Sequence, residues 1–321
     1  MVIASTKATH STADAPRGAP DSIAALLPSW RRSLAARRIS PRTIATYTTS
    51  VEQLAAFLDA NGMPARVAGI RREHVEAFVA DLLTTKAPAT AHNRYRGCQA
   101  FFAWCAEEGE VKTSPMERMK PPRLQDAPPP VLRERDLRAI LAAAEKDRTF
   151  NGYRDSAILR LFVDTGIRRG ELLGIDTPDV DLDEGLVKVS GKTGPRVVPI
   201  GASTVRAIDR YVRARAKRAD AADPALWLGR KGRLLETGLA LVIRTRAAAA
   251  GLDGVHPHLF RHAYAHSMLA AGMQETDLME VAGWKSREMV ARYARSTRAE
   301  RAIKAARALS PGDRMEEGSK R

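Results

Sequence analysis

Two proline clusters constrain the fold of this chain more than any other feature. Pro121-Pro122 and Pro128-Pro129-Pro130 bracket a short polar stretch. Proline cannot continue a helix and this stretch has little to bury, so we predict a linker over residues 121–130. A chain of 321 residues also exceeds the usual size of one domain. We therefore predict domains over residues 21–120 and 131–310, a disordered leader at 1–20 and a flexible tail at 311–321.

The first domain is predicted to be entirely helical. Ser40-Pro41 places a capping residue before a proline at the first helical position, and Asn61-Gly62 ends that helix. Apolar residues at helical spacing indicate another helix over residues 23–36 and two more after residue 62. The last two are marked by Val75, Phe78, Val79, Leu82 and Leu83, and by Tyr95, Cys98, Phe101, Phe102 and Cys105.

The second domain is predicted to combine helices with a small sheet. Apolar spacing indicates helices around residues 137–144 and 158–163. Between Leu186 and Ile200 the period changes to that of strands, which flank the turn Gly191-Lys192-Thr193-Gly194-Pro195. Helical spacing resumes afterwards. The predicted fold class is mainly α with a small antiparallel β-sheet, divided into an N-terminal helical domain and a C-terminal α+β domain.

The charge of the chain indicates a polyanionic partner. Lys and Arg number 52 against 37 Asp and Glu, which gives a net charge of +15. Basic side chains on phosphates release condensed counterions, so nucleic acid is favoured over an anionic membrane surface. A basic surface without a ligand is the alternative. The helix expected over residues 205–218 carries six basic residues and only Asp209 as an acid, which is typical of a solvated face and also compatible with a phosphate track.

The cysteines and the first residues indicate the compartment. Cys98 and Cys105 lie seven residues apart in an expected helix, about 10.5 Å along its axis, too far for a disulfide. We predict that both are reduced core residues of a cytoplasmic protein. Residues 1–20 contain no apolar run of the length of a signal peptide or membrane helix.

Transfer of a phosphoryl group on DNA requires positive charge at the nonbridging oxygens, a proton donor for the leaving oxygen and an aligned nucleophile. Arg168 follows a glycine-bearing break between two helices, and Glu171 comes three residues later. On a helix this spacing places the carboxylate beside the guanidinium, where it orients the guanidinium for a phosphate. An ordinary surface salt bridge is an equal alternative.

His258 and Arg261 form a second candidate pair, one helical turn apart and on one face. His258, His262 and His266 also recur at four-residue steps, which would suit a metal ion. The zinc-hydrolase pattern needs a glutamate between two histidines, and residues 263–265 contain none. A structural role for His262 and His266 is therefore favoured over a metal site.

Trp284 follows Gly283, and Tyr293 lies nine residues further on in an expected helix that Ser286 would cap. A single helical tyrosine is more often a packing residue than a nucleophile. The order of all these residues changes that interpretation, because together they resemble the tyrosine recombinase, or phage integrase, family.

The resemblance covers residues 22–309 and rests on five motifs in order. The family's T-G-x-R-x-x-E motif is matched by Thr165, Gly166, Arg168 and Glu171, and its hairpin lysine by Lys192. Its H-x-x-R motif is matched by His258 and Arg261, and its terminal tyrosine by Tyr293. Trp284 stands where most members have histidine, although some members carry tryptophan there. An indole donates a hydrogen bond and cannot accept a proton.

The resemblance implies roles for these residues. Arg168 and Arg261, assisted by His258 and Trp284, would bind the scissile phosphate, and Tyr293 would attack it to form a 3′-phosphotyrosyl link. His258 would help to remove the tyrosine proton, and Lys192 would protonate the departing 5′ oxygen. Glu171 would support the site. No metal, ATP or cofactor is implied, and the chain has no Walker-type phosphate loop.

The resemblance also implies partners. The family's core-binding domain is matched less specifically, at residues 43–47. This domain and a tyrosine recombinase catalytic domain would close on double-stranded DNA with an inverted-repeat site. The chain would act as a homo-oligomer, a dimer on each site and a tetramer in the synapse, with residues after Tyr293 packing on a neighbouring subunit or on their own domain. No membrane partner is expected. The alternatives are a type IB-like topoisomerase and a non-catalytic DNA-binding protein.

Overall fold

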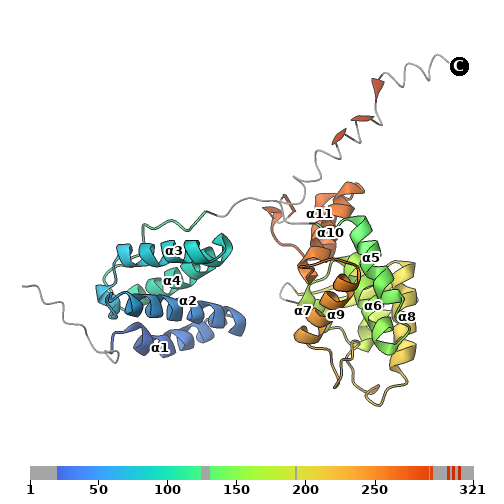
Figure 1. Cartoon of the computed structure of the whole chain (residues 1–321), viewed down its shortest axis with the longest axis horizontal. Helices are drawn as coiled ribbons and strands as arrows, with labels where there is room; N and C mark the ends of the chain where they lie inside the picture. Colours follow the sequence, from blue (N-terminus) through green and yellow to red (C-terminus); the bar gives the residue numbers. More distant parts are fainter. Residues whose placement is uncertain are drawn as a thin grey trace, which may run out of the picture. The chain divides into compact units, whose positions relative to one another are not determined.

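A computed structural model describes residues 20–123, 131–191, 194–288, 290–291, 302–303, 306–307 and 310–311. The chain divides into two compact units, residues 1–126 and 127–321, which are described separately (Figure 1). Nearly all of the predicted leader and tail and most of the predicted linker lie outside the described residues.

The described residues of the first unit form helices and one isolated β-bridge, between Ser22 and Arg66. The helices are α1 (Ile23–Ala36), α2 (Pro41–Ala60), α3 (Arg72–Thr85) and α4 (Pro88–Glu107), with a 3₁₀ turn η1 at Val67–Gly69. Side-chain hydroxyls cap the first two helices, Ser22 accepting from the backbone N–H of Ala25 and Ser40 from that of Thr43. Trp30 of α1 joins the helices, because its ring packs edge-on against Phe101 of α4 at 5.1 Å between centroids.

The two cysteines lie in α4, and both are buried and unbridged, as predicted. Burial raises the pKa of each thiol to about 12, so neither is a thiolate at neutral pH. Both side chains therefore act as small apolar residues of this core.

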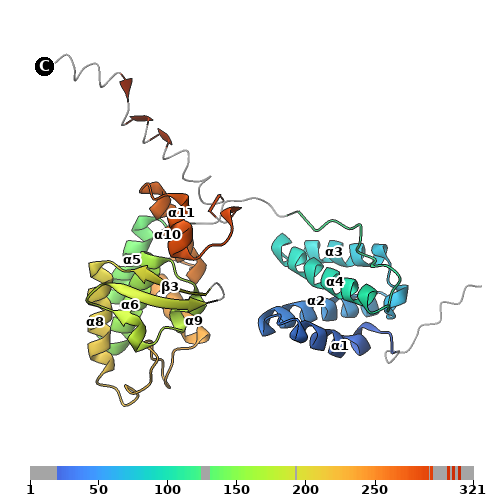
Figure 2. The ribbon, with the colours of Figure 1, turned by 180° about the vertical axis from the view of Figure 1, so that it is seen from behind.

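The second unit packs helices against one face of a three-stranded sheet. Its elements are α5 (Glu134–Glu145), α6 (Phe150–Thr165), α7 (Arg169–Leu173), η2 (Thr177–Asp179), β1 (Val180–Asp181), β2 (Leu186–Gly191), β3 (Gly194–Pro199), α8 (Ala202–Arg215), α9 (Glu236–Ala249), α10 (Pro257–Ala270) and α11 (Glu275–Ala282). The strands run in the order β1-β2-β3 with antiparallel pairing throughout. Figure 2 shows the sheet over α6, on the face turned away in Figure 1. The predicted fold class, mainly α with a small antiparallel sheet, is confirmed.

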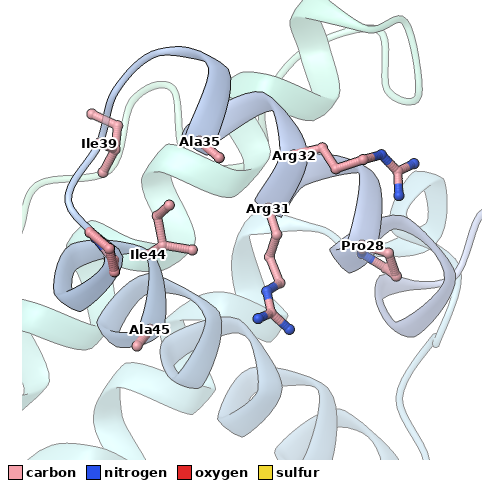
Figure 3. Close-up of a pocket in the computed structure, with 8 residues that line it drawn as sticks. Pro28, Arg31, Arg32, Ala35, Ile39, Ile44 and Ala45 are labelled. Carbon is pink, nitrogen blue, oxygen red and sulfur yellow. The ribbon is translucent and has the colours of Figure 1, made fainter.

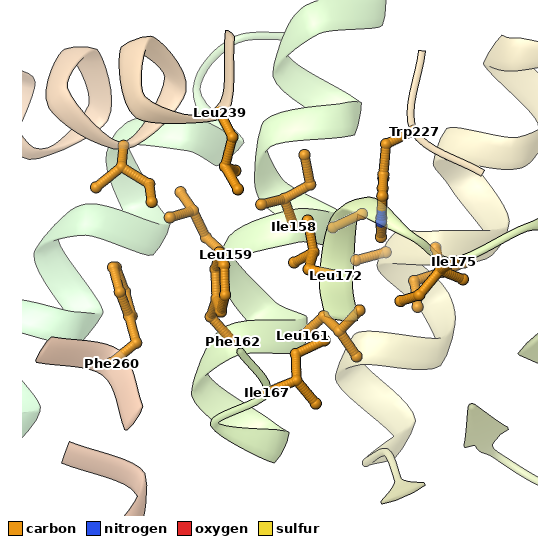
Figure 4. Packing of buried hydrophobic residues seen from close by; sticks show 14 of the residues in the cluster. Ile158, Leu159, Leu161, Phe162, Ile167, Leu172, Ile175, Trp227, Leu239 and Phe260 are labelled. Atoms are coloured by element: carbon orange, nitrogen blue, oxygen red, sulfur yellow. The ribbon is translucent and has the colours of Figure 1, made fainter. Parts of the chain in front are cut away.

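Helix α6 forms the centre of the second core (Figure 4). Leu159 and Phe162 of α6 are fully buried, and the Phe162 ring stacks on Phe260 of α10 at 5.6 Å between centroids. Val187 and Val189 of β2 are buried on the sheet side of the same core. This packing holds the C-terminal end of α6 against α10, where the candidate residues meet.

The basic helix expected over residues 205–218 is α8, which ends at Arg215. Arg215 is buried, and its guanidinium donates to the carbonyl oxygens of Ala221 at 3.0 Å and Ala225 at 2.8 Å. Arg213 is exposed and pairs with Asp209 at 2.9 Å. The prediction was therefore wrong for Arg215, which is neither solvated nor facing a ligand but anchors the loop after α8.

Over the described residues, no helix is both long and apolar enough to cross a membrane.

Candidate active site

Arg168 is positioned by the turn between α6 and α7. Gly166 ends α6 in the left-handed conformation, with a φ of 53°. A Cβ atom at Gly166 would lie 2.7 Å from the Tyr264 ring, so glycine is required on both conformational and steric grounds. The chain then enters α7 with Arg168 as its N-cap. The glycine of the T-G-x-R motif thus places the arginine directly beside α10.

Glu171 holds Arg168 in one orientation. Its Oε2 accepts from the backbone N–H of Arg168 and its Oε1 from Nη1 of the same residue, both at 2.8 Å. Only 1% of the glutamate side chain is exposed, whereas 30% of the Arg168 side chain is. The alternative of an ordinary surface salt bridge does not describe this pair, because its acid is buried.

The sequence analysis missed Arg196, a residue of β3 whose guanidinium binds the same carboxylate. Its Nη1 donates to Oε1 of Glu171 at 2.8 Å and its Nη2 to Oε2 at 2.9 Å. A signal was present in the sequence. Arg196 and Val198 are two residues apart in β3 and therefore share its inward face, where a charged residue requires a buried partner.

The ionised form of Glu171 is strongly favoured. Burial alone would raise the pKa of this carboxyl, but the hydrogen bonds from Arg196 and Arg168 outweigh that effect and lower the pKa to about 2. The carboxylate is therefore a fixed negative charge at any physiological pH.

This pKa predicts how the stability depends on pH. Because the folded pKa of about 2 lies below the ordinary 4.5, the carboxylate's interactions stabilise the fold fully above pH 4.5 and are lost as the pH falls towards 2. We expect the difference in free energy of unfolding between wild type and Glu171→Gln to be constant near neutrality and to shrink over that acidic range. Urea denaturation at a series of pH values measures it, and a difference that stays constant down to pH 2 would contradict the assignment.

Arg261 is brought to the same place by α10. It is 5% exposed, and its guanidinium donates to the carbonyl oxygens of Gly166 and Ala282, both at 2.7 Å. Its Cζ lies 4.9 Å from the centroid of the Trp284 ring, within the range of a cation–π interaction. Arg168 likewise donates through Nη2 to the carbonyl oxygen of Gly283 at 2.9 Å. The carbonyl-rich ends of α6 and α11 therefore orient both arginines.

Trp284 closes one wall of the site. It is 6% exposed and packs in a small cluster with Tyr264, Leu278, Ala282 and Val290. Its indole is therefore a rigid surface against which the Arg261 guanidinium lies.

His258 lies in the first turn of α10 and is exposed, unlike Arg261 and Trp284. Its ring lies 6.3 Å from that of His256, in an edge-on arrangement. Partial desolvation and then the positive charges of His256, Arg261, Arg169 and Arg168 lower the pKa of His258. The imidazole is thus mainly neutral at pH 7, which is the form that accepts a proton.

The alternative metal site finds no support in the arrangement of donors. Over the described residues, no group of three or more His, Cys, Asp or Glu side chains is placed to hold a metal ion. His262 and His266 are half-buried on α10.

Lys192 and Tyr293 lie outside the described residues. The described part of the hairpin nevertheless reaches the site, because a Cβ atom at Gly191 would lie 2.9 Å from Cγ of Glu171. The structure thus brings together Arg168, Glu171, His258, Arg261 and Trp284, with the hairpin that carries Lys192 directly against Glu171. Arg196 and Arg168 share the single carboxylate of Glu171, so positive charge exceeds negative charge among Arg168, Glu171, Arg196 and Arg261, which favours an anion such as a phosphate.

A second candidate surface lies on the first unit. Arg31 and Arg32 project from α1 beside a groove between α1 and α2 (Figure 3). The rest of the groove lining is largely apolar and consists of Pro28, Ala35, Ile39, Pro41, Ile44 and Ala45. Between Asp21 and Glu52 the chain has five arginines and no acidic residue. This surface is therefore strongly basic.

Comparisons with known proteins match both units. Residues 130–300 match the model of the phage integrase family, and residues 26–109 match that of a phage integrase N-terminal SAM-like domain. A tyrosine recombinase XerC of Roseiflexus castenholzii is 32% identical over 257 residues, which cover 78% of this chain and 82% of the relative.

Solved structures share the fold. The XerH site-specific recombinase bound to a palindromic difH substrate has a TM-score of 0.72 and 17% identity, covering 89% of this chain and 84% of its own. A lambda integrase dimer bound to a COC′ core site has a TM-score of 0.67 and 18% identity, covering 85% of this chain and 77% of its own.

Proposed function

Because this chain belongs to the phage integrase family of tyrosine recombinases, we propose that Arg168, Lys192, His258, Arg261, Trp284 and Tyr293 form its DNA-cleavage site. The chain is a site-specific DNA recombinase, an enzyme that cleaves and rejoins DNA strands. The observation that carries the assignment of residues is that the guanidinium groups of Arg168 and Arg261 donate to carbonyl oxygens of consecutive residues, Gly283 and Ala282, at the end of α11.

In the proposed reaction, Arg168 and Arg261 neutralise the nonbridging oxygens of the scissile phosphate. They stabilise the transition state more than the bound substrate, because negative charge on these oxygens increases in the transition state. Tyr293 attacks the phosphorus in line. A phenol has an ordinary pKa of about 10, so two adjacent guanidinium groups are needed to favour its ionised form near neutrality. The neutral imidazole of His258 accepts the phenol proton.

Lys192 gives a proton to the departing 5′ oxygen, and the 3′-phosphate remains bonded to Tyr293. A 5′ hydroxyl from another strand then attacks the phosphotyrosyl phosphorus, releases the phenol and rejoins the DNA. The phosphotyrosyl bond keeps the free energy of the broken phosphodiester, so this sequence of steps requires neither ATP nor a divalent metal nor another cofactor. Glu171 holds Arg168 throughout.

The proposed partner is double-stranded DNA with an inverted-repeat site, bound by a dimer on each site and a tetramer in the synapse. The recombinases of similar fold that are bound to a palindromic substrate and, as a dimer, to a core site support this proposal. We place the activity in the cytoplasm, in agreement with two cysteines that are unbridged.

A cleavage and exchange assay tests the function. Purified protein is incubated in EDTA with nicked DNA that carries the cognate site, and then with two such sites on separate duplexes. We expect a denaturation-resistant protein–DNA adduct in the first assay and recombinant strands in the second. Absence of the adduct would support the non-catalytic DNA-binding alternative, and an adduct without exchange between duplexes would support the topoisomerase.

The basic surface on α1 predicts a specific loss of phosphate contacts. Each contact contributes roughly 0.9 to the slope of log affinity against log salt concentration. We expect Arg31→Ala/Arg32→Ala to make that slope less steep by about 2, with weaker binding of cognate and random DNA alike. Filter binding at a series of salt concentrations measures this.

The matched control is Arg206→Ala/Arg213→Ala, which removes the same charge from α8. If α8 presents a solvated face, the control leaves the slope unchanged. An unchanged slope for the α1 variant would contradict the placement of DNA on this surface.

A further inference from the structure

We infer that Arg196 is a positioning residue of the cleavage site, which fixes Arg168 through Glu171 and locks the β2–β3 hairpin to the end of α11. The inference rests on the proposed function, because it assigns the residue that assembles that site. It concerns a side chain on β3 that none of the five sequence motifs includes.

The carboxylate of Glu171 is shared equally between two arginines. Its Oε1 accepts from Nη1 of Arg168 and Nη1 of Arg196, both at 2.8 Å. Its Oε2 accepts from the backbone N–H of Arg168 at 2.8 Å and from Nη2 of Arg196 at 2.9 Å. Loss of Arg196 would leave a buried carboxylate with half of its hydrogen bonds, and the geometry that presents Arg168 would no longer be fixed.

Arg196 also connects elements that are distant in sequence. Its Nε donates to the carbonyl oxygen of Val281 in α11 at 2.9 Å. A Cβ atom at Gly283 would lie 3.0 Å from its Nη1, so the guanidinium lies directly against the residue whose carbonyl oxygen accepts from Arg168. Arg196 therefore ties β3, which follows Lys192 in the hairpin, to the segment that carries Trp284.

The contacts of Arg196 identify it as a positioning residue and not as a ligand of the phosphate. All three of its side-chain nitrogens, Nε, Nη1 and Nη2, donate to protein atoms. A lysine at this position would keep the charge but could not bind both carboxylate oxygens and the Val281 carbonyl oxygen from one planar group. Substitution by lysine therefore tests geometry separately from charge.

The test compares Arg196→Lys with Arg246→Lys under single-turnover conditions on nicked site DNA, at saturating protein. Arg246 is a matched control, because its side chain is 12% exposed and pairs with two carboxylates, Asp147 and Asp155, outside the site. Both variants are assayed well below their melting temperatures. We expect Arg196→Lys to slow formation of the covalent adduct roughly 10²-fold with DNA affinity within about twofold of wild type. Arg246→Lys is expected to lower the melting temperature and keep the rate within about threefold.

A double-mutant comparison then tests whether Arg196 acts through Glu171. We expect Arg196→Lys/Glu171→Gln to be no slower than the slower single variant, because both changes break one unit. Multiplicative losses, a wild-type rate for Arg196→Lys, or an equal loss of rate for Arg246→Lys would each overturn the inference. Wild-type protein that forms no adduct would instead overturn the proposed function, and the inference with it.

Discussion

Tyr293→Phe is expected to bind cognate DNA with wild-type affinity and to form no covalent adduct. Phenylalanine keeps the ring and removes the hydroxyl that becomes bonded to phosphorus, so the rate of cleavage should fall by at least about 10⁴-fold. Incubation with nicked site DNA, followed by denaturing electrophoresis, measures the adduct, and a mobility-shift titration measures the affinity.

Tyr264→Phe is the matched control, because Tyr264 lies beside Gly166 in the same unit. Its ring is 5% exposed, and burial raises the pKa of its hydroxyl, both of which oppose a role as nucleophile. We expect this variant to form the adduct. An adduct that persists in Tyr293→Phe and disappears in Tyr264→Phe would contradict the assignment of the nucleophile.

Arg261→Lys is expected to have the second largest effect, a loss of roughly 10³-fold in the rate of adduct formation. The guanidinium of Arg261 spans the carbonyl oxygens of Gly166 and Ala282 while lying against Trp284. One ammonium group cannot reproduce that planar fork, so its charge would not be held at the phosphate. Single-turnover kinetics at saturating protein measure the loss, with thermal melting to establish that the variant is folded.

A modified substrate separates loss of charge stabilisation from general damage at Arg261. Replacing one nonbridging oxygen of the scissile phosphate by a methyl group removes the negative charge that the arginine would neutralise. We expect the difference in rate between wild type and Arg261→Lys to narrow on this substrate. A difference that stays the same would mean that Arg261 acts on the fold and not on the phosphate.

Local signals in the sequence predicted most of the fold. Ser40 and Pro41 predicted the start of α2 correctly, since capping and a fixed φ are properties of neighbouring residues. The change of period after Leu186 predicted the hairpin. The end of α8 was predicted at residue 218, three residues late. Arg215 anchors the loop after α8 through the carbonyl oxygens of Ala221 and Ala225, and helical propensity does not encode that contact.

Contacts of the candidate site were predictable from the sequence where both residues belong to one motif. Arg168 and Glu171 are three residues apart, so their contact could be expected from the sequence. The contact between Arg196 and Glu171 spans 25 residues, and the one between Arg261 and Gly166 spans 95. Contacts at such separations depend on the packing of α6, α10 and the sheet, which no local pattern encodes.

Identifying the residue that becomes linked to DNA would decide whether Tyr293 is the nucleophile. The covalent adduct formed on nicked site DNA can be digested with trypsin and nuclease, and the nucleotide-bearing peptide sequenced by mass spectrometry. We expect a nucleotide joined through its 3′-phosphate to Tyr293. Attachment to any other residue, or through a 5′-phosphate, would contradict it.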